Sequence, residues 1–594
     1  MNTDRSPWHP APRGGVLAES GREVAARTAA AWGHRPPDLL LRGATVLLPS
    51  GEWMRRDVGV VGGRVAVVAE DLTAPGEATI DLRGKVLVPG YVEPHAHTLG
   101  PLSIASYCGA VLARGVSCVV SDDSFAYTFV APGSYTRLLD VSRRLPLVLR
   151  WSLRLETPRT IPYRLVMALL ERDDVTQVGE VMTRQALVHP VADICEILAT
   201  ARSRGLRAEG HGPGASEPTL QAGAAAGLSA DHEARTGAEL RDRLRAGMWA
   251  FIRHTDLLRD AHGIVTEMLA AGTPFERTAF TSDWSLPPWI AGDGTIDAAI
   301  AEALRAGLDP AQAYACAGLR PATYEGLDQQ LGAIAPGRMA SLNVLSDPAE
   351  PTPERVFSLG REVAREGELL VDVPDVEWDR LEAPPWTRRA AGPPVDSYRL
   401  RDDDPEIHLE AASMVRRGAG PGGEPIAVVG IEEPTMGMTR ARGYGFPAAL
   451  EGIASTLTPR RLLIGLGGDP AALAHCVDSV VGCGGGIALR HRGELLLLPL
   501  PYGGAISPAP FARVESFWRA VAAAFAELGS DLADPISTML YIGSSGLPGA
   551  RFAEEGLIDT RPGEIIQPAT VVPWRSHGMA VAQPTNRLSS RVGG

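Results

Sequence analysis

Two histidines one residue apart, His95 and His97, follow an apolar stretch at residues 86–94 of this 594-residue chain. On a β-strand, residues i and i+2 point to the same face, so the two imidazole rings are expected to converge on one point. Imidazoles that converge at the end of a buried strand can bind a transition-metal ion. An isolated pair is weak evidence for a metal site, because most buried histidines only make hydrogen bonds.

Four more residues at the ends of later strand-like segments complete a set of metal ligands. They are Glu180, His211, His232 and Asp283. A carboxylate such as Glu180 can bridge two cations, and the histidines can be divided between them, with a shared water in the middle. The set predicts two divalent ions per chain, of Mn, Fe or Zn, because histidine and carboxylate sites accept each of these metals.

The same set predicts a hydrolytic reaction. Two cations would lower the pKa of the shared water, and the hydroxide would attack a carbon bonded to nitrogen, in an amino-heterocycle or an amide. Asp283 is the candidate to take the water's proton and deliver it to the departing nitrogen. Glu233, next to His232, is a second candidate catalytic residue, which would contact the substrate or orient a ligand.

The segments that carry these residues alternate between strand and helix. Strands are predicted at 86–94, 117–121, 145–149, 177–181, 207–211, 228–231, 248–252 and 278–282. Helices are predicted between them or after the last, for example at 190–204 and 295–306. Eight strand–helix units in about 235 residues match the size of a (β/α)8 barrel, whose active sites lie at the carboxyl ends of the strands.

The regions on both sides of the barrel are expected to form further domains. Short strands are predicted at 39–48, 58–61, 64–68 and 78–82, and again at 341–345, 362–364 and 368–370. The predicted fold class is therefore α/β, with three parts: a TIM-like barrel at 86–330, a small β-sandwich domain built from 17–85 and 331–380, and a C-terminal α/β domain at 406–594. Residues 1–16 are expected to be a disordered arm, and the proline-rich stretch 381–405 a linker.

Composition limits the partners and the compartment. The formal net charge of −13 argues against a nucleic-acid-binding protein, which would carry a basic surface. No apolar run reaches the ~18 residues that a membrane span needs. The six cysteines show no CxxC spacing, which argues against a disulfide scaffold or a thiolate zinc site. The amino-terminal stretch lacks the apolar core of a signal peptide, so a cytoplasmic location is expected.

Several motifs resemble the amidohydrolase superfamily, and within it bacterial adenine deaminases. PGYVEPHAH at 89–97 is similar to the superfamily signature PG[FL][IV]DxHxH, and GAIAPGRMASLNVL at 332–345 resembles its closing strand. The other matching segments are ARGVSCVVSD at 113–122, GEVM at 179–182, AEGHGPG at 208–214, LSADHEA at 228–234 and the glycine-rich stretch 483–507. In GEVM, Glu180 corresponds to the glutamate that replaces the superfamily's carboxylated lysine. The resemblance implies a metal-dependent homodimer that deaminates adenine or a similar small heterocycle and releases ammonia.

The chain also departs from the adenine deaminase pattern at expected pocket positions. Where the family reads approximately TDPHE, residues 121–125 read SDDSF, and where it has Asp-Asp-Arg, this chain has Asp283-Trp284-Ser285. The HDSHN motif is replaced by residues 458–462, and the third strand ends with arginines where the family has apolar or small residues. The candidate substrate-binding residues are accordingly Asp122, Arg150, Arg154 and Trp284. For the two arginines, helix capping or pairing with Asp or Glu is favoured over the alternative, recognition of a carboxylate or other anionic group of the substrate.

Three hypotheses follow from these patterns. The first is hydrolytic deamination of adenine or an adenine-like amino-heterocycle. The second is an amidohydrolase that acts on a cyclic amide or a secondary metabolite, which the departures favour. The third is a non-catalytic protein that keeps the fold. The intact ligand set argues against the third, because unpaired polar groups are costly to bury.

Overall fold

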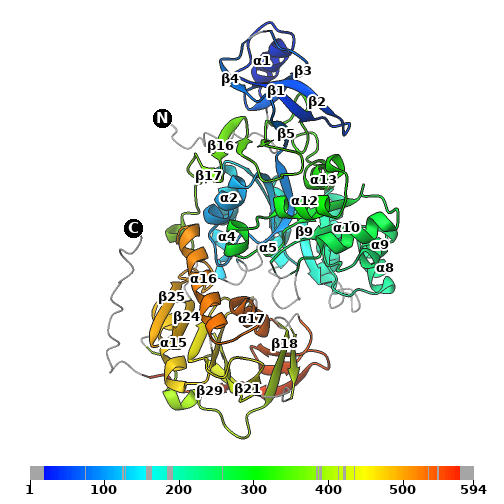
Figure 1. Ribbon diagram of the computed structural model, residues 1–594. Helices are drawn as coiled ribbons and strands as arrows, with labels where there is room; N and C mark the ends of the chain where they lie inside the picture. Colours follow the sequence, from blue (N-terminus) through cyan, green and yellow to red (C-terminus); the bar gives the residue numbers. More distant parts are fainter. Residues whose placement is uncertain are drawn as a thin grey trace. The chain divides into compact units, whose positions relative to one another are not determined.

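The computed structural model divides the chain into two compact units (Figure 1). The first contains Met1–Pro385 and Leu500–Ala526, and the second contains Trp386–Pro499 and Glu527–Gly594. The structure describes residues 19–575, except 74, 123–125, 127–128, 156–162, 183–190, 257, 383–385, 387–390, 412–413, 419–422, 434, 533 and 545–546. The expected amino-terminal arm and part of the expected linker therefore lie outside the described residues.

An eight-stranded parallel barrel forms the centre of the first unit and confirms the predicted fold class. Its strands are hydrogen-bonded in chain order: β6 (Tyr91–Ala96), β7 (Val116–Asp122), β8 (Val148–Leu153), β9 (Val175–Met182), β10 (Arg207–His211), β11 (Ala230–Asp231), β12 (Trp249–Arg253) and β13 (Thr278–Thr281). The last strand returns to the first, because Ala96 and Asp283 form a parallel bridge and the Thr281 hydroxyl donates to the His95 carbonyl at 2.6 Å. Because the eight strands are parallel, their carboxyl ends lie together at one end of the barrel.

Helices that lie between the strands or after the last strand cover the outside of the barrel (Figure 1). They are α2 (Ile104–Ala113), α4 (Pro132–Leu139), α5 (Tyr163–Leu169), α7 (Ala192–Ser203), α8 (Glu217–Ala226), α9 (Gly237–Arg245), α10 (Ala261–Ala270), α11 (Pro287–Ala291), α12 (Ile296–Arg305), α13 (Pro310–Ala317) and α14 (Leu319–Tyr324). Apolar residues three or four positions apart face the strands, as Ile194, Ile197 and Leu198 do in α7. The strands are apolar along most of their length because helices bury them from outside.

A nine-stranded sheet unites segments from both sides of the barrel in sequence. After α1 (Gly21–Ala31), it contains β1 (Leu39–Leu47), β2 (Trp53–Val61), β3 (Arg64–Ala69), β4 (Ala78–Asp81), β5 (Val86–Pro89), β14 (Leu342–Leu345), β15 (Arg355–Ser358), β16 (Arg361–Arg365) and β17 (Glu368–Leu369). The junction is β5, which pairs parallel with β1 and antiparallel with β14.

The stretch 86–94, predicted as one barrel strand, is two strands in different sheets. Gly90 is the point of change: its N–H donates to the Ser341 carbonyl, and the next N–H, of Tyr91, donates to the Gly115 carbonyl. A Cβ at position 90 would lie 2.3 Å from the Ser117 hydroxyl, so glycine permits the close approach. Pattern alone could not show this change of partner, because both strands are buried and apolar.

The second unit contains a nine-stranded sheet of its own and a three-stranded one. The larger sheet consists of β18 (Glu406–Ala411), β19 (Met414–Arg417), β20 (Ile426–Glu432), β21 (Gly437–Tyr444), β22 (Gly452–Ser455), β23 (Leu462–Gly467), β24 (Gly486–His491), β25 (Glu494–Pro499) and β29 (Thr570–Val571). The smaller consists of β26 (Ala550–Ala553), β27 (Gly556–Asp559) and β28 (Glu564–Pro568), and the helices are α15 (Pro470–Gly482) and α17 (Pro535–Ile542).

One segment of the C-terminal region packs in the first unit. It includes most of α16 (Phe511–Glu527), and Ser507 donates its N–H to the Pro101 carbonyl at 3.0 Å. Tyr502 stacks on Trp378 with ring centroids 5.0 Å apart. The boundaries predicted at 86–330 and 406–594 do not include this exchange and remain predictions. Among the described residues, no helix combines the length and apolar character needed to cross a bilayer.

Candidate metal centre

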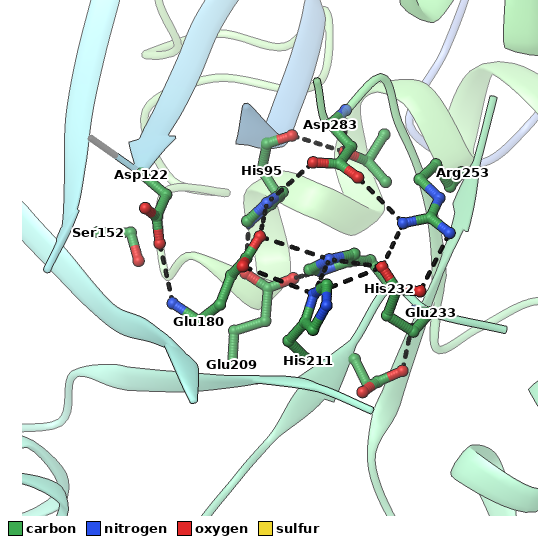
Figure 2. Close-up of polar contacts among 12 residues, drawn as sticks. His95, Asp122, Ser152, Glu180, Glu209, His211, His232, Glu233, Arg253 and Asp283 are labelled. Atoms are coloured by element: carbon green, nitrogen blue, oxygen red, sulfur yellow. Dashed lines mark hydrogen bonds and ion pairs between the residues drawn. The ribbon is translucent and has the colours of Figure 1, made fainter. Parts of the chain in front are cut away.

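The barrel brings the six predicted metal ligands together at the carboxyl ends of its strands, and Figure 2 shows all of them except His97. His95 lies near the end of β6 and His97 directly after it. Glu180 lies in β9 and His211 ends β10. His232 and Asp283 follow β11 and β13. The six residues lie at or within two residues of the ends of five parallel strands, which is why positions far apart in sequence converge.

His95 and His97 face the same two carboxylate oxygens. The Nε2 atom of His95 is 3.1 Å from Glu180 Oε1 and 3.5 Å from Asp283 Oδ1. The Nε2 atom of His97 is 3.3 Å from the same Glu180 oxygen and 3.1 Å from the same Asp283 oxygen. Two imidazoles and two carboxylates therefore surround one small volume, as the sequence analysis predicted.

A second group lies beside the first and includes Glu233. His211 Nδ1 is 3.4 Å from His232 Nε2 and 3.5 Å from Glu180 Oε2. Glu233 Oε1 is 3.4 Å from His211 Nδ1 and 3.5 Å from His232 Nε2. In the described residues, the ligand atoms of His211, His232 and Glu233 lie within 4.8 Å of one another. The carboxylate assigned a catalytic role from the sequence is thus also placed where a metal ligand would be.

Hydrogen bonds to the second ring nitrogens fix how the histidines are oriented. Glu209 accepts from His95 Nδ1 and from His232 Nδ1, both at 2.8 Å. His97 Nδ1 lies 2.9 Å from the Asp122 backbone carbonyl, which can only accept. Burial alone would raise the pKa of Glu209, but the neighbouring His95 and His232 rings hold it at about 2, so Glu209 stays ionised. The Nδ1 atoms of His95, His97 and His232 therefore each carry a proton, and the Nε2 lone pair of the neutral ring is the one available to a metal.

These lone pairs make a divalent metal a chemically fitting occupant. His95 is fully buried, and its Nε2 has no hydrogen-bond partner among the described residues, although it faces two carboxylate oxygens. An imidazole nitrogen directed at two carboxylates is repulsive unless a cation, either a proton on Nε2 or a metal ion, lies between them. Burial alone would lower the pKa of His95, but the neighbouring carboxylates raise it well above its usual value, so the site favours a cation at this position. Imidazole nitrogens and carboxylate oxygens are the ligand types that Zn, Mn and Fe accept. The buried set therefore fits divalent metal binding.

Replacement of Glu209 by glutamine should weaken metal binding. Glutamine presents one oxygen and one NH2, so a donor would face the N–H of His95 or of His232 and one ring would change tautomer, placing its proton on Nε2. Loss of such a supporting contact typically costs ~10–100-fold in metal affinity. Competition with a chromophoric chelator measures this change. The matched control is Glu276→Gln, at an exposed position; equal affinity of both variants would contradict the supporting role of Glu209.

The predicted substrate-binding residues fall in different places. Arg154 Nη1 is 3.0 Å from Glu180 Oε2 and 3.5 Å from Asp122 Oδ1, and Asp122 Oδ2 accepts the Glu180 N–H at 2.8 Å. The Trp284 ring is half-buried, with its centroid 6.0 Å from that of His97. Arg150 is buried and donates to the Leu149 carbonyl, outside this group. Residues 123–125, where the chain departs from the family pattern, lie outside the described residues.

Arg253 is the principal site residue that the sequence analysis did not identify. It ends β12, donates to both oxygens of Glu233, and donates to Asp283 Oδ2 at 3.0 Å. Burial disfavours its charge, but Glu233 and Asp283 raise the pKa of its guanidinium above the usual value. The position of Arg253 could have suggested a role, because β10, β11 and β13 all end near a candidate residue. The strand predicted at 248–252, however, ended one residue before Arg253.

Comparison with known proteins confirms the resemblance to adenine deaminases. Residues 424–564 match the family described as adenine deaminase C-terminal domain. An adenine deaminase of Moorella thermoacetica is 29% identical over 585 residues, which cover 92% of this chain and 97% of that protein. An adenine deaminase of Nitratidesulfovibrio vulgaris is 29% identical over 563 residues, which cover 89% of this chain and 96% of that protein.

Solved structures match part of the chain. The crystal structure of a β-aspartyl dipeptidase from Fervidobacterium islandicum AW-1 has a TM-score of 0.46 and 18% identity, and the match covers 56% of this chain and 98% of that one. A dihydropyrimidinase from Brevibacillus agri has a TM-score of 0.44 and 12% identity, with 56% of this chain and 96% of that one covered.

Proposed function

We propose that this chain, which is similar to adenine deaminases over about nine-tenths of its length, is a metal-dependent hydrolase. It replaces the exocyclic amino group of adenine, or of an adenine-like amino-heterocycle, with oxygen from water and releases ammonia. The observation that carries this proposal is the buried set of histidines and carboxylates at the carboxyl ends of the barrel strands. Metal-assisted hydrolysis needs such a set, together with a group that moves protons.

We propose that the centre holds two divalent ions of Mn, Fe or Zn. His95, His97 and Asp283 would hold one, His211 and His232 the other, and Glu180 would lie between them because its two oxygens face the two groups. Glu233 is a further ligand candidate for the second ion. The buried carboxylates of this site outnumber its guanidinium groups, so bound cations would offset the remaining negative charge.

The reaction then follows from where the side chains lie. Metal bound at this site would supply the acidified water that attacks the ring carbon. Asp283 receives the proton of that water and passes it to the departing nitrogen, which leaves as ammonia. Trp284, whose ring lies near His97, is placed to contact a planar heterocycle, and Arg154 is placed beside Glu180 to contact a polar group of the substrate. We further propose that the substrate is a small molecule and that the protein forms a homodimer.

An ammonia-release assay on metal-quantified protein tests this function. Adenine, substituted aminopurines, lactams and ureides are supplied in turn, and the products are identified by mass spectrometry. We expect stoichiometric ammonia and an amino-to-oxygen exchange with at least one aminopurine. Because residues 284–285 differ from the family pattern, substituted aminopurines belong in the first panel beside adenine. Ring-opened products from lactams or ureides, with none from aminopurines, would exclude the proposed deamination.

A further inference from the structure

Arg253 joins two carboxylates that belong to different strands of the barrel. Its Nη1 and Nη2 atoms donate to the two oxygens of Glu233, and Nη1 also donates to Asp283 Oδ2 at 3.0 Å (Figure 2). Only 4% of the arginine is exposed, so water neither screens nor replaces these contacts. A bidentate guanidinium–carboxylate pair fixes direction as well as distance.

Each carboxylate directs its other contacts toward a different group of histidines. Asp283 uses Oδ1, the oxygen that Arg253 does not contact, to face His95 and His97. Glu233 faces His211 and His232 with Oε1, an oxygen that Arg253 also contacts. The guanidinium therefore contacts the side of Asp283 away from the histidines and both oxygens of Glu233, and so connects the carboxylates of the two halves of the site.

The backbone of Asp283 shows why such support is needed. Its φ is +47°, in the left-handed region that residues other than glycine adopt only where surrounding contacts hold them there. The contacts here are the bridge to Ala96, the N–H bond to the Thr281 hydroxyl at 3.2 Å and the ion pair to Arg253. Of these, only Arg253 acts on the carboxylate that would move the proton.

We propose that Arg253 is a positioning residue that aligns Asp283 and Glu233 together. The kinetic part of this proposal rests on the proposed deamination. With Oδ2 held, the Asp283 carboxylate cannot rotate away from the histidine pair between receiving the proton of water and delivering it to the leaving nitrogen. Without the guanidinium, two buried carboxylates would repel each other and rotate independently. A misplacement of about 1 Å in such a group can cost ~10²-fold in rate.

The first test compares Arg253→Ala and Arg253→Lys with wild type in steady-state deamination. We expect kcat of Arg253→Ala to fall by ~10²-fold, with KM changed far less, because alignment rather than substrate binding is lost. Methylguanidine added to Arg253→Ala should restore at least ~10-fold of kcat by filling the vacated space. Lysine keeps the charge but lacks the planar fork, so an intermediate kcat is expected. The matched control, Arg235→Ala, removes an exposed arginine paired with Asp260 and should behave like wild type with or without methylguanidine.

The second test does not depend on activity. Co²⁺ is bound to each variant, and its visible absorption reports the ligand geometry around the ion. We expect Arg253→Ala to alter the bands and methylguanidine to restore them, while Arg235→Ala matches wild type. If wild type releases no ammonia from any aminopurine, the proposed function fails, and the Co²⁺ spectra still decide the role of Arg253. If Arg253→Ala does not fold, the same measurements on Arg253→Lys apply. The proposal would be overturned if the folded variants had the kcat and the Co²⁺ spectrum of wild type. It would also be overturned if methylguanidine restored neither the kcat nor the spectrum of Arg253→Ala.

Discussion

Protein carrying both His95→Ala and His211→Ala should bind almost no divalent metal and release no measurable ammonia. Each substitution removes an imidazole from a different half of the site, while the fold keeps its barrel strands. Elemental analysis of wild type prepared with excess Mn or Zn should give about two ions per chain, because one bridging carboxylate and two histidine pairs suit a two-metal site. The double variant should give a value near zero.

The controls for this prediction separate metal loss from loss of fold. His262→Ala removes a half-exposed histidine whose nearest carboxylate is Glu302 at 3.5 Å, and it should keep both the metal and the activity. Circular dichroism should show the same helix content in both variants. Chelation of wild type followed by addition of Mn or Zn should abolish and then restore ammonia release. Unchanged metal content in the double variant would exclude the proposed centre.

The barrel could be predicted from sequence because each of its strands is short, apolar and followed by a helix. The predicted segments 117–121, 177–181, 207–211 and 278–282 match β7, β9, β10 and β13 to within two residues. The segment 145–149 was placed three residues early, because the apolar run before β8 continues its pattern. The change of sheet at Gly90 and the return of Leu500–Ala526 to the first unit depend on contacts between distant segments, which no local pattern contains.

The convergence of the candidate ligands could be predicted because they lie at the carboxyl ends of strands of one parallel barrel. The residues that support them could not be predicted in this way. Spacing alone places Glu209 only on the same face of its strand as His211. The structure shows that Glu209 is shared between His95 and His232. That sharing requires two strands to be brought to one carboxylate. Arg253 could not be predicted for the same reason, because its two partners, Glu233 and Asp283, follow the strands on either side of β12.

The two arginines of the third strand show the limit of arguments from spacing. Arg150 and Arg154 share a face by period-two alternation, so both were predicted to be substrate-binding residues. At ~3.3 Å per residue they are about 13 Å apart along an extended chain, so only one can reach the carboxyl end of the barrel. Arg154 reaches Glu180, whereas Arg150 is buried and donates to the Leu149 carbonyl. A contact of Arg150 with substrate remains a prediction, and the geometry favours Arg154.

Asp283→Asn should retain the fold and most of the bound metal but lose hydrolysis. Three ligands of the first group, His95, His97 and Glu180, are unchanged, so the ion still has a site. An amide cannot accept the proton of water and deliver it to the leaving nitrogen, and such proton transfers contribute ~10²–10⁴-fold. The amide also meets Arg253: if its oxygen faces the histidine pair, its NH2 faces a guanidinium that can only donate.

Steady-state kinetics and metal analysis of the same preparation check this prediction. Metal content and kcat are measured together. A lower kcat at constant metal content would assign proton transfer to Asp283, whereas a parallel loss of metal and kcat would show that Asp283 acts mainly as a metal ligand. Asp293→Asn, an exposed position ten residues later, is the matched control and should keep wild-type rates. If Asp283→Asn keeps more than about half of wild-type turnover, against the loss expected of a proton-transfer group, the proton moves through another residue. Glu233 would then be the first to test, because its Oε1 faces His211 and His232 and it shares Arg253 with Asp283.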